Sequence, residues 1–452
     1  MLDLLFGIVV IGALGTCYAR PGAAVGLLLS GFALEQCAQA FVPLAGRNNS
    51  LVNYILALFV AIATLRQVLR FGVRVLFPRG PMALSIVFLA YCYLTVTWSI
   101  FPSVTENILL ESLPYVLVFV GLAPLTVQSE QDLNDAFFSL VIATTTTFLL
   151  LILFAEWGGR SVYLPYGDFY SNPLALTQAA GASLICVTLS PVLRRLPRPL
   201  GLPFALVTLS VVLVAFVRTG SRGQIVSSIA TVLFFVAITK RGIWFLPVAL
   251  SSIALLGTSL FEDEVRANRL RWSGDQMRRD LTEDRIGSAQ QLFEYWSSSD
   301  PLHVLFGLGN SISYDPRILG GYPHVVPVEV LCEEGIVGAL LFAACIGLSV
   351  HYAIKAGLSS NGLTRQLFTT VLALMLYEFL LTLKQGSLLG SRTFLTLVSL
   401  PSSFVVLSRI LSIETQGETR GQALHRTLAP SPASKRPGRD RSQPTALSAI
   451  RR

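Results

Sequence analysis

The stretch LGLPFALVTLSVVLVAFV occupies residues 200–217 and contains no charged residue. A helix needs roughly 20 mostly apolar residues to cross the hydrocarbon core of a bilayer. Runs of similar length and composition recur along the chain, beginning with MLDLLFGIVVIGALG at residues 1–15. The sequence therefore predicts a protein built from membrane-spanning helices.

The composition agrees with this prediction. Of the 452 residues, 53% are hydrophobic and only 13% are charged, whereas a soluble globular domain carries about 25% charged residues. This deficit excludes an ordinary soluble enzyme or a disordered chain. It also excludes a nucleic-acid-binding protein, which the net charge of +8 alone would have suggested.

The cysteines and the first residues carry no further signal of processing or metal binding. The six cysteines show no CxxC spacing, so they are interpreted as small apolar residues and not as disulfides or a zinc site. Residues 1–15 lack the basic segment of a cleavable signal peptide. We expect them to form a retained first span.

We expect twelve or thirteen spans, which makes the fold class an all-α polytopic membrane protein with one large helical periplasmic loop. The spans are predicted near residues 2–19, 22–44, 51–65, 82–100, 108–127, 133–155, 174–193, 200–217, 223–239, 242–261, 333–354, 366–383 and 393–412. Four segments follow from them: N-terminal transmembrane helices (1–260), the loop (261–332), C-terminal transmembrane helices (333–412) and a basic, flexible cytoplasmic tail (413–452).

The basic residues of the short loops predict the orientation, because such residues favour the cytoplasmic side. With the spans above, the basic loops all fall on one side: Arg66, Arg70, Arg74 and Arg79; Arg194, Arg195 and Arg198; Lys240 and Arg241; Lys355 and Arg365. The tail adds eight basic residues against three acidic ones, or +5 of the +8. Anionic lipid headgroups are an alternative partner for it.

A few cations lie on the opposite, periplasmic side, where they stand out. They are Arg218 and Arg222 around the 218–223 loop, Arg285 in the large loop, and Lys384 and Arg392 in the 384–392 connection. Guanidinium groups bind phosphate oxygens bidentately and stay charged, so these cations predict a site for a lipid diphosphate. Two alternatives stay open: Arg222 pairs with Glu35, Glu111 or Glu378, or Lys384 only reaches the membrane interface.

His324 and Glu333 are the remaining candidates. His324 follows Gly320, Gly321 and Pro323, which predict a tight turn just before a span. An imidazole titrates near neutral pH and can accept a hydroxyl proton. Glu333 either orients a ligand or caps the span that follows. The glycines of FGLGNS at 306–311 match no nucleotide-binding motif, so neither ATP nor another cofactor is expected.

At these residues the sequence resembles the superfamily of O-antigen ligases and Wzy-type polysaccharide polymerases of bacterial inner membranes. Three blocks in order carry the resemblance: TGSRGQIVS (219–227) with Arg222, RIGSAQQLFEYWSSSDPLHVLFGLG (285–309) with Arg285, and YPHVVPVEVLCEEGIVG (322–338) with His324 and Glu333. One departure is Val325, where the family usually has Asn after the His.

The resemblance implies a glycosyltransferase C-like fold and transfer of a glycan from undecaprenyl diphosphate to a sugar hydroxyl on the periplasmic face. It implies inversion at the anomeric carbon, with no metal. Arg222 and Arg285 would hold the diphosphate, and His324 would activate the acceptor. Arg218 is a further candidate for substrate binding because it flanks the same outer loop as Arg222. Lys384 is added from topology alone.

The acceptor divides the possible functions. A second lipid-linked chain would make the protein a polymerase of O-antigen or exopolysaccharide, with a chain-length regulator as a possible partner, and this is the expectation. Lipid A core would make it an O-antigen ligase. A secondary transporter or lipid flippase is the alternative from a different class, but no internal repeat is visible and the candidate residues gather on one face.

Overall fold

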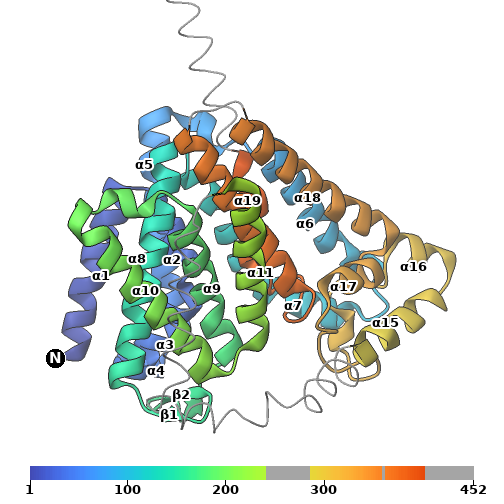
Figure 1. Ribbon diagram of the computed structural model, residues 1–452. Helices are drawn as coiled ribbons and strands as arrows, with labels where there is room; N and C mark the ends of the chain where they lie inside the picture. The colour runs from blue at the N-terminus through green and yellow to red at the C-terminus, as the bar shows by residue number, and fades with distance from the viewer. Residues whose placement is uncertain (241–285, 359–361, 403–452) are drawn as a thin grey trace, which may run out of the picture. The chain divides into compact units, whose positions relative to one another are not determined.

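The computed structural model describes residues 1–240, 286–358 and 362–402, which all belong to one of two units, Met1–Leu407; the second unit is Ser408–Arg452. The predicted tail, the predicted span at 242–261, the second half of the span at 393–412 and Arg285 lie outside the described residues. The described residues are almost entirely helical (Figure 1).

The N-terminal half contains these elements: α1 Leu2–Ala19, α2 Gly22–Leu29, α3 Gly31–Phe41, α4 Pro43–Arg47, α5 Leu51–Phe71, η1 Val73–Leu76, α6 Gly80–Leu94, η2 Thr95–Thr97, α7 Pro102–Val116, the π-helical segment η3 Leu117–Leu122, η4 Ala123–Thr126, α8 Glu130–Phe154, β1 Trp157–Gly158, β2 Ser161–Leu164, β3 Phe169–Tyr170, α9 Pro173–Leu189, η5 Val192–Arg195, α10 Arg198–Thr219 and α11 Arg222–Thr239. The later elements are α15 Gly287–Ser297, α16 Pro301–Phe306, η9 Ile312–Tyr314, α17 Val326–Glu333, α18 Gly335–Leu358, α19 Gly362–Thr382 and α20 Arg392–Ser399.

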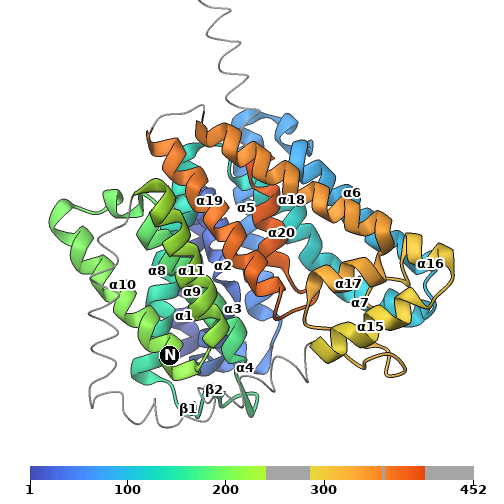
Figure 2. The ribbon, with the colours of Figure 1, turned by 45° about the vertical axis from the view of Figure 1, so that its right-hand side comes forward.

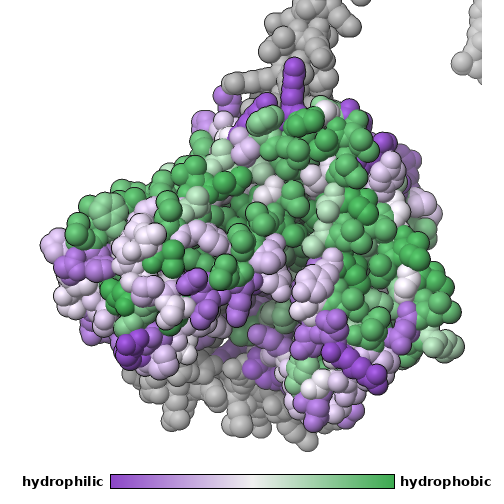
Figure 3. All heavy atoms as spheres, turned by 180° about the vertical axis from the view of Figure 1, so that it is seen from behind, coloured by the Kyte–Doolittle hydropathy of each residue, from purple (hydrophilic) through white to green (hydrophobic). Residues whose placement is uncertain are grey.

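Eight described helices are long and apolar enough to cross a membrane, and nine if α2 and α3, bent by 67° at their junction, form one span. They are α1, α5, α6 with η2, α7 with η3 and η4, α8, α10, α11 and α18. Many of their leucines and phenylalanines are exposed, and Figure 3 shows a broad hydrophobic surface over these helices with hydrophilic residues gathered toward one end. The predicted class, an all-α polytopic membrane protein, is confirmed.

Small residues let the central helices pack closely. Gly22 and Gly26 of α2 lie against α8, where added Cβ atoms would stand 1.8 Å from the Asp132 carbonyl oxygen and 2.0 Å from the Ala136 carbonyl oxygen. Such small-xxx-small spacing is a common device for helix contact in membranes. It holds α2 against α8 in the interior of the bundle, as Figures 1 and 2 show.

The predicted cytoplasmic loops gather at one end of the bundle, which we call the basic end. The Asp135 carboxylate of α8 pairs with Arg195 of η5 and, at 3.7 Å, with Arg20 after α1. The start of α8 also meets the start of α19, because Thr364 donates to Glu130. Segments that the sequence placed on one side are therefore neighbours in space.

The predicted periplasmic loops gather at the opposite end, which we call the loop end. The Arg160 Nε between β1 and β2 donates to the Thr219 carbonyl oxygen at 2.8 Å, and the Ile100 amide donates to the Leu308 carbonyl oxygen at 3.1 Å. Asp3 accepts from the Leu44 amide at 3.2 Å. The two faces inferred from charge thus correspond to two ends of the structure.

Three local expectations differ from the structure. Residues 156–173, which connect two predicted spans and were expected to be a loop, contain a three-stranded antiparallel sheet in the order β1-β2-β3. The helix predicted from residue 108 begins at Pro102, so the 101–107 loop is largely helical. The span predicted from residue 333 begins two residues later, as α18, and a separate short helix, α17, ends at Glu333; Gly335, the first residue of α18, has a φ of 69° that breaks the helical backbone between them.

Candidate functional site

The turn between α10 and α11 places Arg222 at the loop end. Gly220 ends α10 in the left-handed conformation, with φ of 57°, which is the usual role of Gly after a helix. The buried hydroxyl of Ser221 donates to the Pro173 carbonyl oxygen at 3.2 Å. Arg222, the first residue of α11, is half-buried. The Ser-Arg-Gly motif therefore fixes the start of α11 against α9.

Lys384 meets this turn from the other end of the sequence. Its ammonium donates to the Gln224 Oε1 atom at 3.1 Å. A Cβ atom at Gly223 would stand 1.9 Å from the Lys384 Nζ, so the ammonium lies directly over the Gly223 backbone. The structure thus brings Lys384 to the residues that flank Arg222, as topology alone had suggested.

Gln224 holds this arrangement together and was not among the predicted residues. Its fully buried amide nitrogen donates to the Leu174 carbonyl oxygen at 3.0 Å and to the Gln385 Oε1 atom at 2.8 Å. A buried amide inside an otherwise apolar span is the signal that would have identified it, because such groups are kept only where they find partners. We call Arg222, Gly223, Gln224 and Lys384 the cationic cluster.

The 384–392 connection also joins α17, the helix that follows His324. The Glu329 carboxylate accepts from the Leu388 amide at 3.0 Å, and both residues are buried. Glu329 lies in the first turn of α17, and Leu388 is in the same connection as Lys384. The connection therefore has the cationic cluster at its start and the His324 segment at its middle.

His324 has a constrained backbone and an aromatic neighbour. Its φ is 62°, a left-handed value that is uncommon outside glycine. The half-buried imidazole packs edge-on against Tyr322, with ring centroids 4.4 Å apart. Tyr322 in turn lies 6.2 Å from Tyr314. The predicted turn at Gly320 and Gly321 is present, and it directs His324 to the start of α17.

The carboxylate of Glu333 is bound by backbone groups. It accepts from the amides of Ser311 at 2.5 Å and Ser313 at 3.1 Å, while Glu334 accepts from the Asn310 amide group at 2.5 Å. Burial raises the pKa of Glu333 to about 7 and that of Glu334 to about 8. These contacts favour a structural role, in which both acids anchor the 310–313 segment on α17.

Arg218 contacts β1 and the end of α8. Its guanidinium lies 4.9 Å from the Trp157 ring centre and donates to the Ile152 carbonyl oxygen at 3.3 Å. These contacts close the end of α8, where carbonyl groups lack helical partners. Arg285 lies outside the described residues, which resume at Ile286.

Of the three acids named as alternative partners for Arg222, Glu378 and Glu35 accept from amide groups and Glu111 is exposed. Glu378 accepts from Gln178 at 2.6 Å, and Glu35 accepts from Asn53 at 3.2 Å. Within residues 1–240, 286–358 and 362–402, no group of three or more His, Cys, Asp or Glu side chains is arranged to hold a metal. The expected absence of a metal and of a cofactor stays a prediction.

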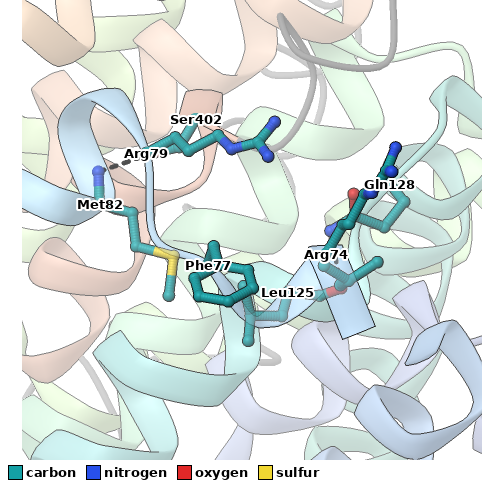
Figure 4. A pocket seen from close by; sticks show the side chains of 8 residues that line it. Arg74, Phe77, Arg79, Met82, Leu125, Gln128 and Ser402 are labelled. Atoms are coloured by element: carbon teal, nitrogen blue, oxygen red, sulfur yellow. Dashed lines mark hydrogen bonds between the residues drawn. The ribbon is translucent and has the colours of Figure 1, made fainter. Parts of the chain in front are cut away.

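The described part of the chain contains a cavity near these residues and another at the opposite end of the bundle. The larger, of about 600 Å³, is at the loop end and contains Arg392, Tyr314 and Ser387. The smaller, of about 40 Å³, is at the basic end between Arg74 and Arg79, where the Met82 amide donates to Ser402 at 2.7 Å (Figure 4). The smaller cavity has room for a few water molecules only.

Fold and site together define the class: an all-α polytopic membrane protein with a cationic cluster and a histidine at one end of its helices. The chain is similar to the O-antigen ligase of Pseudomonas aeruginosa, with 26% identity over 292 residues that cover 62% of this chain and 68% of the relative. No protein-family model matches the chain. Of the two groups of proteins that the sequence resembles, the similarity supports the O-antigen ligases and not specifically the Wzy-type polymerases.

Proposed function

We propose that this protein is a membrane glycosyltransferase of lipopolysaccharide assembly, which moves a glycan from undecaprenyl diphosphate to a sugar hydroxyl. The observation that carries the proposal is the convergence of Lys384 on the Arg222–Gln224 turn. Cations gathered at one end of apolar helices suit a ligand that joins a diphosphate to a hydrocarbon chain. The similarity to an O-antigen ligase supports the same class of substrate.

In the proposed reaction, the oxygen of the acceptor hydroxyl attacks the anomeric carbon, and the bond from that carbon to the diphosphate oxygen breaks. Inversion follows from a single displacement of this kind. His324 accepts the hydroxyl proton, and undecaprenyl diphosphate leaves with the bonding electrons. Arg222 and Lys384, with Arg285, stabilise the negative charge that the leaving diphosphate gains.

The acceptor we favour is lipid A core, so that the protein is an O-antigen ligase. The reason is the similarity to an O-antigen ligase. It favours a ligase over the polymerase that was expected from the sequence. We propose that the protein lies in the inner membrane, and the charge pattern of its loops supports an orientation with the loop end in the periplasm. The donor glycan, the acceptor and the surrounding lipids are its proposed partners.

Gel analysis of lipopolysaccharide from a deletion strain tests the proposal. Loss of all attached O-antigen together with accumulation of long lipid-linked polymer is the result expected of a ligase. Lipopolysaccharide capped with single repeat units would instead indicate that the protein is a polymerase. A chain-length regulator would then be an expected partner. An unchanged lipopolysaccharide pattern would contradict both assignments.

A further inference from the structure

The large cavity at the loop end is distinct from the cationic cluster. It lies between α5, α7, η3 and the 384–392 connection, and neither Lys384, Gln224 nor His324 lines it. Its volume of about 600 Å³ is within the range of small-molecule sites in proteins, roughly 300–1,000 Å³. A lipid headgroup would fit in such a space.

The walls of the cavity combine two chemistries. One part is apolar and includes Leu28, Leu56, Ile108, Val118, Phe119 and Leu389; the other is polar and includes Asn53, Glu111, Tyr314, Ser387 and Arg392. A site of this mixed character suits a molecule with a polar head and a hydrocarbon portion. Arg392 is the one cation among the lining residues.

The Arg392 guanidinium is held in place by its neighbours and forms no salt bridge with a described carboxylate. It lies 3.6 Å from the Tyr115 ring centre, and its Nε donates to the Leu389 carbonyl oxygen at 3.2 Å. The salt bridges among the described residues do not include Arg392. Glu35 is close enough to attract the guanidinium electrostatically but forms no salt bridge with it. A preorganised guanidinium that faces a cavity is suited to bind a phosphate group.

The cavity is bounded by a membrane-facing part of α5 and α7. Pro114 interrupts the hydrogen bonding of α7, and the π-helical segment η3 follows it. Next to these residues, the side chains of Tyr54, Leu58 and Leu117 are 68%, 47% and 55% exposed. Hydrocarbon chains leaving the cavity between α5 and α7 would therefore lie along an apolar surface.

We propose that this cavity binds the phosphorylated headgroup of a membrane lipid, with its phosphate on Arg392 and its hydrocarbon chains between α5 and α7. Tyr314 lines the cavity and leads through Tyr322 to His324. Tyr322 therefore lies between the cavity wall and the residue that accepts the hydroxyl proton. Given the proposed function, the bound lipid is the acceptor substrate.

Lipid binding by the purified full chain tests this inference without any transfer assay. Dioleoyl phosphatidic acid is titrated into the protein in detergent, and the bound lipid is counted by native mass spectrometry. We expect Arg392→Gln to weaken binding about tenfold or more, because it removes a charge-assisted contact. Ala57→Phe, which fills the cavity beside Leu56 and leaves Arg392 in place, is expected to weaken it similarly.

Four controls define the outcome: two variants and two alternative ligands. Arg79→Gln, at the basic end, and His324→Ala are expected to bind the lipid as the wild type does. Dioleoylglycerol, which lacks the phosphate, is expected to bind weakly, and inorganic phosphate is expected not to compete at equal concentration. If inorganic phosphate does compete, the cavity is a site for a free anion and not for a lipid headgroup, and the inference is overturned.

The failures of the two proposals can be told apart. Unchanged binding in both Arg392→Gln and Ala57→Phe would overturn the lipid site and leave the proposed transfer reaction standing. Normal lipid binding in a protein that transfers no glycan would overturn the proposed function and leave the lipid site standing.

Discussion

The ammonium nitrogen of Lys384 lies so close to the Gly223 backbone that a Cβ atom at position 223 would stand 1.9 Å from it. The two residues are 161 positions apart, and Gln224 fixes their contact by accepting from the same ammonium at 3.1 Å. The glycine of the Ser-Arg-Gly motif therefore has a specific purpose: it leaves room for a cation beside Arg222.

Gly223→Ala is expected to reduce glycan transfer about tenfold or more. The added methyl group must push the end of the flexible Lys384 side chain away from Arg222, which removes part of the charge that stabilises the diphosphate. Folding should change little, because the displaced atoms belong to the far end of a flexible side chain. The measurement is the initial rate of transfer by equal amounts of membrane-inserted protein.

Gly347→Ala is the matched control for this variant. Gly347 also lies in a helix, α18, but has open space where a Cβ atom would be added. Full activity in Gly347→Ala with loss in Gly223→Ala is the expected pair of results. Equal rates in both variants would show that the contact between Gly223 and Lys384 does not matter for transfer.

Val325→Asn is expected to stabilise the protein by about 0.5–2 kcal/mol. Val325 is the N-cap residue of α17 and offers no side-chain hydrogen bond there. Asn is among the preferred N-cap residues, because its side-chain oxygen can accept from a free amide of the first turn. The thermal unfolding temperature of the purified protein should rise in Val325→Asn. A rise of the same size in Val325→Leu would show that capping is not the cause.

The stability of the protein is expected to fall as the pH rises from about 5 to about 8. Burial raises the pKa of Glu334 from 4.5 to about 8. Between these values the folded protein keeps a proton that the unfolded chain releases. The unfolded state therefore binds fewer protons, and the free energy of unfolding decreases with pH.

Glu334→Gln is the variant that tests this pH dependence. It keeps an oxygen for the Asn310 amide and removes the titration, so the slope of unfolding temperature against pH should become smaller. Glu294→Gln, at an exposed carboxylate paired with Gln290, should keep the wild-type slope. If Glu334→Gln keeps the full slope as well, the buried carboxylate is not its source.

The sequence predicted the membrane helices well, because each apolar run is local. The first nine predicted spans coincide with described helices, although α9, the seventh, is shorter than the eight helices that could cross a membrane. The basic loops gather at one end, as the charge pattern indicated. The strands β1 and β3 have only two residues each, which is too short for an alternating pattern. The start of α7 at Pro102 was missed because the polar residues 103–107 hide the helix in a hydropathy reading.

The candidate site was predicted in part. Arg222, Lys384 and His324 were identified because charged and titratable residues are rare in this chain, and the structure brings Lys384 to the Arg222 turn. Arg392 was noted only as an outer cation, because the cavity around it is formed by segments distant in sequence. The backbone partners of Glu333 are 20 and 22 residues before it, so no local pattern indicated its burial.

The most direct test of the central claim is glycan transfer by the purified full-length protein. The donor is a fluorescent glycan on undecaprenyl diphosphate, the acceptor is lipid A core, and no nucleotide sugar is added. We predict that the wild type forms labelled lipopolysaccharide, and that Arg222→Ala and His324→Ala form none although they unfold at the wild-type temperature. Transfer at the wild-type rate by both variants would contradict the assignment of this site.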